Sequence, residues 1–486
     1  MKNSKLLFCT FLLLLPMLLF PQKIKEVVIE GDAPAFAIGK TARLVVFEDL
    51  LNYTPSTVAT AVIDKKGHFT LKYKTHTTRL TQLVIQMAKA EFFIEPEKRY
   101  EISVDIDEEL FKLPFPEEYG GFLQITNLQP DTNELNYRLA LFSNLFNKIT
   151  DEYLPYFTYY KDKAQYDTMT DILHQYFDFA YAPQDFYQSY LYYTYASLEN
   201  IMYEKYPDTL YRRYLDNEYF LYDQPAFMDF FNLFYEQYLL NSPKIPKELL
   251  LQHINIQPDY LELFNLAGRD PRLQNERIRE LVIIKNLGEF YGQKQFSKSN
   301  VLSLLDYIET HTHFPEHPLY IQNLKRRLAT FAKGGQLPAT VFKEVNGADF
   351  KIEKMKGKWT YIQFFASSCE DCLREMMILK EIEQKYKDSL NILSISLDYD
   401  FNDFSNFRQS YGKLFPWQFV HFNQHCEWLE QVHLFGLPDY LLLAPDGSIA
   451  NRYPATPDKG LSRFLLQKFS KEEETGDPLS PHFKGE

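Results

Sequence analysis

The hydrophobic pattern of the chain changes twice along its length, and each change marks a different kind of fold. From residue 23 to 115, short runs rich in β-branched and aromatic residues are separated by turn residues, which is typical of strands. From 133 to 333, apolar residues recur at helical spacing. From 336 to 470, strand-like runs alternate with helical stretches, as in a mixed sheet with helices on both faces. A chain of 486 residues is long enough for such a division into domains.

The first part is expected to form a small β-sandwich or barrel, because its strands are short and closely spaced. Of these two arrangements we favour the sandwich. The sequence from Asp64 to Gly67 has the residue types of a hairpin turn between two strands. The predicted strands are KIKEVVIEG, ARLVVFED, STVATAVID, GHFTLKYKT, TQLVIQMA, AEFFIEP and RYEISVDI.

The second part is predicted to be a helical region rich in aromatic residues. The chain contains 35 Tyr and 41 Phe, and they are especially dense in residues 153–238. Either these rings form a tyrosine-rich helical core, or they line a groove that binds a partner or substrate. Asp270-Pro271 and Ser297 predict helix starts, because a capping side chain precedes apolar residues at helical spacing.

The N-terminus has the pattern of a secretory signal. Two lysines within the first five residues precede an apolar run from Leu6 to Phe20. We therefore predict a signal peptide over residues 1–22 and export to the periplasm or cell envelope. No clear cleavage site follows, so an uncleaved membrane anchor is left open, although the run is shorter than the ~20 residues that span a bilayer comfortably. At the other end, residues 471–486 are polar and are predicted to be a loose tail.

Cys369 and Cys372 form a C-x-x-C motif between a predicted strand, WTYIQFFA, and a helix predicted over residues 370–387. At the start of a helix, unpaired backbone N–H groups and the helix dipole favour a thiolate. The second cysteine lies one turn along, close enough for the disulfide that thiol–disulfide exchange requires. Half of a metal site and two inert thiols are the alternatives. A structural zinc site usually needs two such pairs, and the sequence has no second pair.

The last part resembles the thioredoxin superfamily, and within it the exported TlpA-like branch. The resemblance rests on Phe364-Phe365-Ala366 before Cys369 and Cys372, on Gly436-Leu437-Pro438 before a strand, and on the turn Pro445-Asp446-Gly447. The order of the three parts is also similar to that of exported multidomain proteins from Bacteroidetes-type bacteria. The expected fold class is therefore α+β multidomain, with an N-terminal small β-sandwich, a central helical region and a C-terminal thioredoxin-like α/β/α domain.

The resemblance implies roles for individual residues of a thiol–disulfide oxidoreductase. Cys369 would be the attacking thiol, Cys372 the resolving thiol, and Pro438 a cis-proline that faces the disulfide. Glu375 matches an acidic position thought to assist proton handling, although helical spacing alone would also make it a solvated residue. The implied partners are a protein disulfide as substrate and a membrane or periplasmic electron donor.

No cofactor and no metal are expected for this chemistry. The net charge of the chain is −13, and it has no long basic block. Because nucleic-acid binding needs a basic face, this composition argues against a nucleic-acid partner.

The motif departs from the family pattern at several positions. Ser368 stands where the family usually has Trp, Glu370-Asp371 where it has Gly-Pro, and Met377 where it often has proline. Two carboxylates beside Cys369 disfavour its thiolate, although the helix dipole favours negative charge there. We therefore expect a less acidic thiol than in a strong oxidant, and hence a reducing couple.

Other candidate residues lie outside the motif. His311, His313 and His317 gather in HTHFPEHP and could bind zinc, or could form a polar loop between helices. Cys426 could be a regulatory thiol, a third exchange partner, or a plain buried thiol at a helix start. The alternative to an enzyme is a non-catalytic envelope scaffold, in which the thioredoxin domain has drifted and the β and helical parts bind a partner.

Overall fold

The computed structural model describes most of the chain. The signal peptide predicted over residues 1–22 lies outside the described residues, and so does the predicted tail beyond residue 474. Among the residues that are described, no helix is both long and apolar enough to cross a membrane. The described residues are 25–127, 131–160, 162–203, 207–217, 219–330, 334–434 and 436–474.

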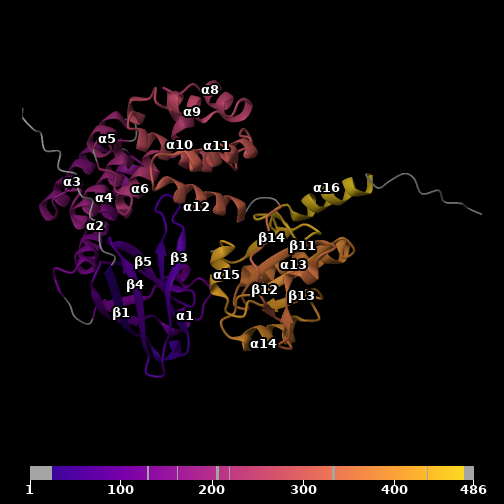
Figure 1. Ribbon diagram of the computed structural model, residues 1–486. Helices are drawn as coiled ribbons and strands as arrows, with labels where there is room; N and C mark the ends of the chain where they lie inside the picture. Colours follow the sequence, from indigo (N-terminus) through magenta and orange to yellow (C-terminus); the bar gives the residue numbers. More distant parts are fainter. Residues whose placement is uncertain are drawn as a thin grey trace, which may run out of the picture.

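Two four-stranded sheets build the N-terminal domain (Figure 1). The strand order is β4-β1-β7-β8 in one sheet and β3-β2-β5-β6 in the other. Side chains from both sheets, including Val27, Leu44 and Leu83, meet in one hydrophobic cluster. Every strand predicted for this part is present, and β8 is an addition. The strands are β1 (Lys25–Asp32), β2 (Thr41–Phe47), β3 (Pro55–Val62), β4 (His68–Thr75), β5 (Arg79–Ile85), β6 (Ala88–Ile94), β7 (Arg99–Asp105) and β8 (Gln124–Asn127).

The turn predicted from Asp64 to Gly67 is present, but the strands that it joins lie in different sheets. The N–H of Gly67 donates to the carbonyl of Asp64 (3.0 Å), and the φ of Gly67 is +88°, which glycine adopts without strain. From this turn, β3 pairs with β2, whereas β4 pairs with β1. The prediction of a hairpin within one sheet is therefore wrong. Turn residues determine the local reversal of the chain, but sheet membership depends on pairing with distant strands.

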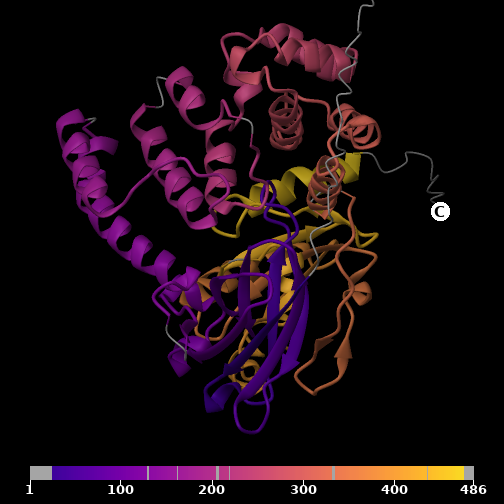
Figure 2. The ribbon, with the colours of Figure 1, turned by 60° about the vertical axis from the view of Figure 1, so that its left-hand side comes forward.

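The central region is helical, and its helices stack above the β domain in Figure 1. Figure 2 shows the same helices from the side, arching over the strands. The predicted start at Ser297 is confirmed, because its side chain accepts from the N–H of Asn300 and caps α11. The helices are α2 (Leu135–Thr158), α3 (Lys163–Tyr176), α4 (Phe186–Tyr203), α5 (Pro207–Tyr214), α6 (Pro225–Phe234), α7 (Tyr238–Asn241), α8 (Lys247–Leu251), α9 (Tyr260–Ala267), α10 (Glu276–Phe290), α11 (Lys298–His311) and α12 (His317–Thr330).

The aromatic stretch 153–238 supplies much of the helical core. Tyr193, Tyr214 and Tyr235 are fully buried in one large cluster together with the phenylalanines of α6. For these rings the core interpretation is confirmed. Tyr159, near the start of the stretch, is exposed.

A loop of the β domain enters this helical core. Leu50 and Leu51, between β2 and β3, are buried within the helical cluster. Next to them, the carboxylate of Asp49 accepts a hydrogen bond from the Asn323 side chain (2.6 Å) on α12. The β domain and the helical region are therefore joined by a shared core rather than by a linker alone.

The C-terminal domain contains a seven-stranded mixed sheet with the order β10-β9-β13-β12-β11-β14-β15. Alternate residues of the central strand β11 enter two hydrophobic clusters, since Ile362 belongs to one and Tyr361 to the other. The domain comprises β9 (Phe342–Lys343), β10 (Asp349–Phe350), β11 (Trp359–Phe365), α13 (Glu370–Tyr386), β12 (Leu390–Ser396), α14 (Phe401–Tyr411), β13 (Gln418–His421), α15 (Cys426–Gln431), β14 (Asp439–Leu443), β15 (Ile449–Asn451) and α16 (Leu461–Glu474).

Two expectations for this domain need correction. The run CEWLEQVHLFG, residues 426–436, predicts one helix, but α15 ends at Gln431. The last helix, α16, continues to Glu474, into the stretch predicted as tail. The strands β9, β10 and β13 have no counterpart among the predicted elements.

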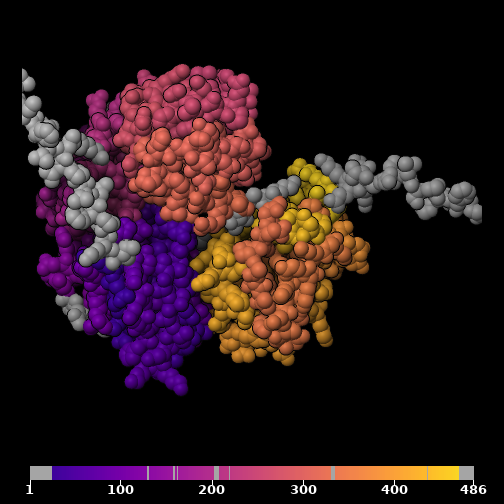
Figure 3. Space-filling view, viewed as in Figure 1, coloured from indigo at the N-terminus to yellow at the C-terminus, as the bar shows by residue number. Residues whose placement is uncertain are grey.

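The β domain and the C-terminal domain are in contact along one side (Figure 3). Arg43 of β2 has only 5% of its surface exposed, and its guanidinium donates to the carboxylate of Glu430 on α15 at 2.8 Å. Phe115, from the segment before β8, is likewise 5% exposed and belongs to a hydrophobic cluster of the C-terminal domain. The C-terminal domain is thus held against the β domain by polar and apolar contacts.

Candidate active site

Cys369 and Cys372 lie at the start of α13 and form a disulfide, with a Cα–Cα distance of 5.3 Å. Cys369 is the N-cap of the helix, and its Sγ accepts a hydrogen bond from the backbone N–H of Cys372 (3.1 Å). Cys369 is half-buried, whereas Cys372 is fully buried. An external sulfur atom can therefore approach Cys369, and Cys372 is placed to react only with Cys369.

Pro438 lies at the same edge of the sheet as the cysteines. Strand β14 runs antiparallel to β11, with Asp439 opposite Phe364, so Pro438 adjoins the end of β11 from which the Cys369 loop begins. The Leu437–Pro438 peptide bond is cis, as the resemblance implied. Pro438 is only partly buried, so a molecule bound at Cys369 can contact it.

Glu375 is held between α13 and the sheet. It is half-buried, and its carboxylate accepts a hydrogen bond from the hydroxyl of Tyr440, on β14. Burial raises the pKa of Glu375, and the hydrogen bond from Tyr440 opposes this shift only in part. Glu375 is therefore more than a solvated helix residue, because its pKa depends on a hydrogen bond from Tyr440, two positions after Pro438.

Asp398 anchors the loop that leads into the motif, and the sequence analysis did not select it. It is buried just after β12, and one of its carboxylate oxygens accepts from the backbone N–H (2.8 Å) and the hydroxyl (2.7 Å) of Ser367. The other oxygen accepts from the hydroxyl of Ser396 (2.6 Å). Asp398 thereby ties the end of β12 to Ser367, which lies between the end of β11 and Cys369.

A second buried polar chain, also outside the predicted set, reaches the backbone of Cys372. Gln363, in the middle of β11, donates from its side chain to the carbonyl of Cys372 (3.3 Å). The hydroxyl of Ser394 donates to Gln363 (3.1 Å), and the indole N–H of Trp417 donates to Ser394 (2.9 Å). These residues fix the first turn of α13 against the sheet.

A signal for these residues was present in the sequence. Gln363 interrupts the apolar run WTYIQFFA, and Ser394 and Ser396 interrupt LNILSISLD. A polar side chain inside a buried strand needs a hydrogen-bond partner, so each interruption indicates a buried contact. The sequence alone did not indicate which partner each residue has.

The positions that depart from the family pattern lie on the outside of the motif. Ser368, Glu370 and Asp371 are exposed, and Met377 is 47% exposed on α13. Asp371 forms an ion pair with Arg374 one turn along the helix. The carboxylates next to Cys369 therefore face solvent, where they can interact with an approaching molecule.

Cys426 is a buried free thiol at the start of α15. Burial raises its pKa to about 12, although the nearby Arg43 lowers it to some extent. Such a thiol is protonated at neutral pH, and thiols react as thiolates. Of the three interpretations, the plain buried thiol is the one that this geometry supports.

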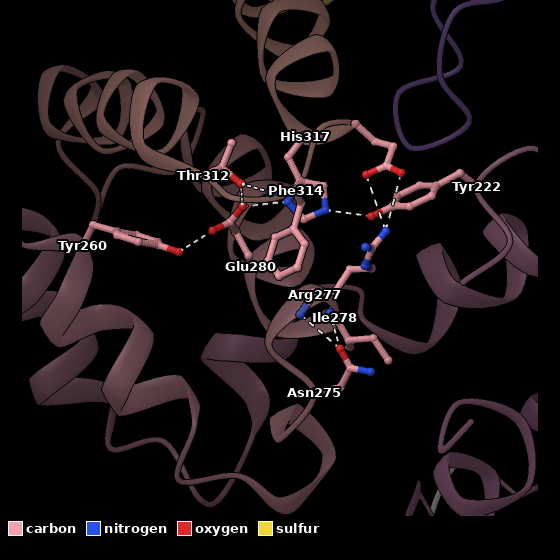
Figure 4. A network of polar contacts seen from close by, with 10 residues as sticks. Tyr222, Tyr260, Asn275, Arg277, Ile278, Glu280, Thr312, Phe314 and His317 are labelled. Carbon is pink, nitrogen blue, oxygen red and sulfur yellow. Dashed lines mark hydrogen bonds and ion pairs between the residues drawn. The ribbon is translucent and has the colours of Figure 1, made fainter. Parts of the chain in front are cut away.

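The three histidines of HTHFPEHP do not come together. His311 is exposed and stacks on Tyr307, with ring centroids 4.0 Å apart, and His313 is also exposed. His317 is fully buried, and both of its ring nitrogens have partners (Figure 4). In the described part of the chain, no group of three or more His, Cys, Asp or Glu side chains could hold a metal ion.

The network around His317 is part of the helical core. Its Nδ1 lies 2.7 Å from a carboxylate oxygen of Glu280, and its Nε2 lies 2.9 Å from the hydroxyl of Tyr222 (Figure 4). Burial alone would raise the pKa of Glu280, but hydrogen bonds from His317, Thr312 and Tyr260 lower it. Glu280 is therefore an ionised, fully partnered residue that ties α10 to the start of α12.

Part of the C-terminal domain matches a known protein family. Residues 357–449 match a family described as thioredoxin-like. A thiol–disulfide oxidoreductase ResA from Bacillus thuringiensis subsp. konkukian is 28% identical over 139 residues, which cover 28% of this chain and 78% of that protein. The ResA of Bacillus subtilis is 22% identical over 148 residues, which cover 30% of this chain and 81% of that protein.

Among solved structures, the thioredoxin domain of a thiol–disulfide oxidoreductase from Bacteroides vulgatus is 23% identical to this chain. The similarity covers 28% of this chain and 97% of that domain, with a TM-score of 0.26. The residues of the family match lie within the C-terminal domain.

Proposed function

We propose that the chain is a thiol–disulfide oxidoreductase of the TlpA-like branch of the thioredoxin family, and that it reduces disulfides of partner proteins. The match of residues 357–449 to a thioredoxin-like family and the similarity to a ResA thiol–disulfide oxidoreductase support this proposal. The observation that carries the proposal is the asymmetric pair at the start of α13. Cys369 is half-buried and its Sγ accepts a backbone hydrogen bond, whereas Cys372 is fully buried behind it. One cysteine is thus suited to attack a partner and the other to resolve the product.

The reaction transfers two electrons from the dithiol to the substrate. The thiolate of Cys369 attacks one sulfur of the partner disulfide, so that a mixed disulfide forms and the other partner sulfur leaves as a thiolate and takes up a proton. The thiolate of Cys372 then attacks the sulfur of Cys369. The Cys369–Cys372 disulfide forms, and the second partner sulfur is released as a thiol. The domain ends oxidised, as in the structure.

Glu375 and Pro438 have supporting roles in this proposal. Glu375 follows Cys372 by three residues on α13 and its pKa is raised by burial, and we assign it the proton that leaves Cys372 before that thiolate attacks. Pro438 adjoins the Cys369 loop and would contact the backbone of the bound partner.

The reducing direction is supported by the charges at the helix start. Glu370 and Asp371 are exposed next to Cys369, and negative charge disfavours a thiolate. A less stabilised thiolate makes the dithiol form a better electron donor. In this proposal a thiol donor in the membrane or periplasm returns electrons to Cys369–Cys372 after each cycle. We also propose that the predicted signal at residues 1–22 directs export, which would place the chain in the compartment where protein disulfides form.

The reduction potential of the Cys369–Cys372 couple tests the proposal. The full chain is equilibrated in a dithiothreitol or glutathione series, and its free thiols are counted at each ratio. We expect a reversible couple well below the glutathione potential, and a Cys372→Ser variant that accumulates a mixed disulfide with its partner. If the couple does not titrate reversibly and the Cys372→Ser variant forms no mixed disulfide, the non-catalytic scaffold is favoured instead.

A further inference from the structure

A segment of the β domain reaches the loop of the C-terminal domain that carries Pro438. After β7 the chain passes through α1 (Glu108–Phe111) and a 3-10 turn, Pro116–Tyr119, before it returns to β8. Phe115 at the start of this turn is buried in a cluster of the C-terminal domain, against which Leu437 also packs. Leu437 is the residue before Pro438, so the turn is anchored beside the proline loop.

Glu118 in this turn lies directly against the proline loop. A methyl group built on Gly436 would lie 2.5 Å from a carboxylate oxygen of Glu118, so the Glu118 side chain would have to move if a larger residue replaced the glycine. Glu118 is itself exposed, and next to it Tyr119 has 60% of its surface exposed. The carboxylate is therefore open to solvent while it is in contact with the loop that carries Pro438.

Exposed carboxylates lie both at the motif and at this turn. Glu370 and Asp371 are exposed and directly follow Cys369, and Glu118 is exposed against Gly436 of the proline loop. Asp371 is paired with Arg374, and Glu117 in the turn is paired with Lys89 of the β domain. A polypeptide that reaches Cys369 along the proline loop would therefore meet Glu118 at the loop and Glu370 at the motif.

We propose that Glu118 is a specificity-determining residue supplied by the β domain, and that with Glu370 it selects partner disulfides flanked by lysine or arginine. The inference rests on the proposed function and names its substrate class. Opposite charges on the partner would be attracted to these carboxylates and would lie beside the proline loop during attack by Cys369. Acidic partners would be disfavoured by the same carboxylates.

Charged model substrates test the inference with the full chain. Two synthetic peptides carry the same internal disulfide, one flanked by lysine and arginine and the other by glutamate. The rate constant for reduction by the dithiol form is measured for each peptide at low and at high salt. We expect the basic peptide to react about fivefold faster at low salt. The advantage should shrink at high salt, because exposed charges are then screened.

Variants show which carboxylate is responsible. Glu118→Gln is expected to lower the ratio of the two rate constants, and Glu118→Lys to lower it further. Glu248→Gln is the matched control, because Glu248 is an exposed glutamate on α8, which lies far from the C-terminal domain (Figure 1). This variant should keep the ratio of the unaltered protein. Each ratio is internal to one preparation, so a partly unfolded sample does not change it.

The outcomes separate the inference from the proposed function. Reduction of neutral 2-hydroxyethyl disulfide by the unaltered chain, with equal rates for the two peptides, would overturn the inference and leave the function in place. Failure to reduce any of the three disulfides would overturn the function itself. If Glu118→Lys changed both peptide rates by the same factor, the turn would only obstruct the site, and the selectivity assigned to Glu118 would be wrong.

Discussion

Asp398 shows how a single residue shapes the redox loop. Its buried carboxylate accepts three hydrogen bonds, from the N–H and hydroxyl of Ser367 and from the hydroxyl of Ser396. In Asp398→Asn, an NH2 group replaces one carboxylate oxygen, so it would face a serine group that now donates to that oxygen. Because this buried hydrogen bond is lost, we expect the free energy of unfolding to fall by about 1 to 3 kcal/mol. Urea unfolding measures the change. Ser368→Ala, an exposed neighbour, is the control, and equal stability of the two variants would contradict the anchoring role.

Glu375 should make stability depend on pH in a defined direction. Burial raises its folded-state pKa, so the folded state binds this proton more tightly than the unfolded state does. The resulting stabilisation is present at acidic pH and is lost as the pH rises through the folded-state pKa. Glu375→Gln keeps an oxygen that can accept from Tyr440 but carries no charge. We therefore expect it to be more stable than the unaltered protein at pH 7 and equally stable at acidic pH, as thermal unfolding at several pH values would show. A stability gain of equal size at both pH values would contradict this assignment.

At the scale of elements, β2 and α15 are joined by Arg43. Its guanidinium is buried and contacts both Glu427 and Glu430. We expect Arg43→Ala to lower the free energy of unfolding of the chain by about 1 to 3 kcal/mol, because charge-assisted hydrogen bonds are lost. All 3 tryptophans lie in the C-terminal domain, so their fluorescence reports the loss of that part of the fold. Arg99→Ala removes an exposed pair with Glu30 and should change stability by less than about 1 kcal/mol. Similar effects of both substitutions would mean that Arg43 does not join the domains.

Elements with a strong hydrophobic period were predictable, and those formed by long-range pairing were not. The strand WTYIQFFA and the helix after it lie where the pattern places them, since local spacing determines both. The two-residue strands β9 and β10 are too short to have a period, and they exist because they pair with each other beside β13. Likewise, the C-x-x-C motif indicated Cys369 and Cys372, but no local pattern connects Glu118 with Gly436, which are far apart in the sequence and meet only when domains pack.

At the scale of the whole molecule, contacts between distant segments join all three parts. The loop with Leu50 and Leu51 enters the helical core, and Arg43 and Phe115 hold the β domain against the C-terminal domain. The β domain is therefore in contact with both of the other parts (Figure 3). This arrangement places a β-domain residue, Glu118, beside the redox site, which a flexible linker between domains would not do.

The same arrangement predicts that the three parts unfold together. Leu50 is buried in the helical cluster although it belongs to the β domain, so Leu50→Ala leaves a cavity there and should cost about 2 to 5 kcal/mol. Circular dichroism follows the helices, and tryptophan fluorescence follows the C-terminal domain. Because the β domain is in contact with both, we expect both transitions to move to lower urea by the same amount, which is the behaviour of one cooperative unit.

Val62→Ala, at an exposed position of β3, is the control and should move neither transition. If only the helical transition moved, the C-terminal domain would be an independent unit, and Glu118 would not be held beside Gly436 firmly enough to select substrates.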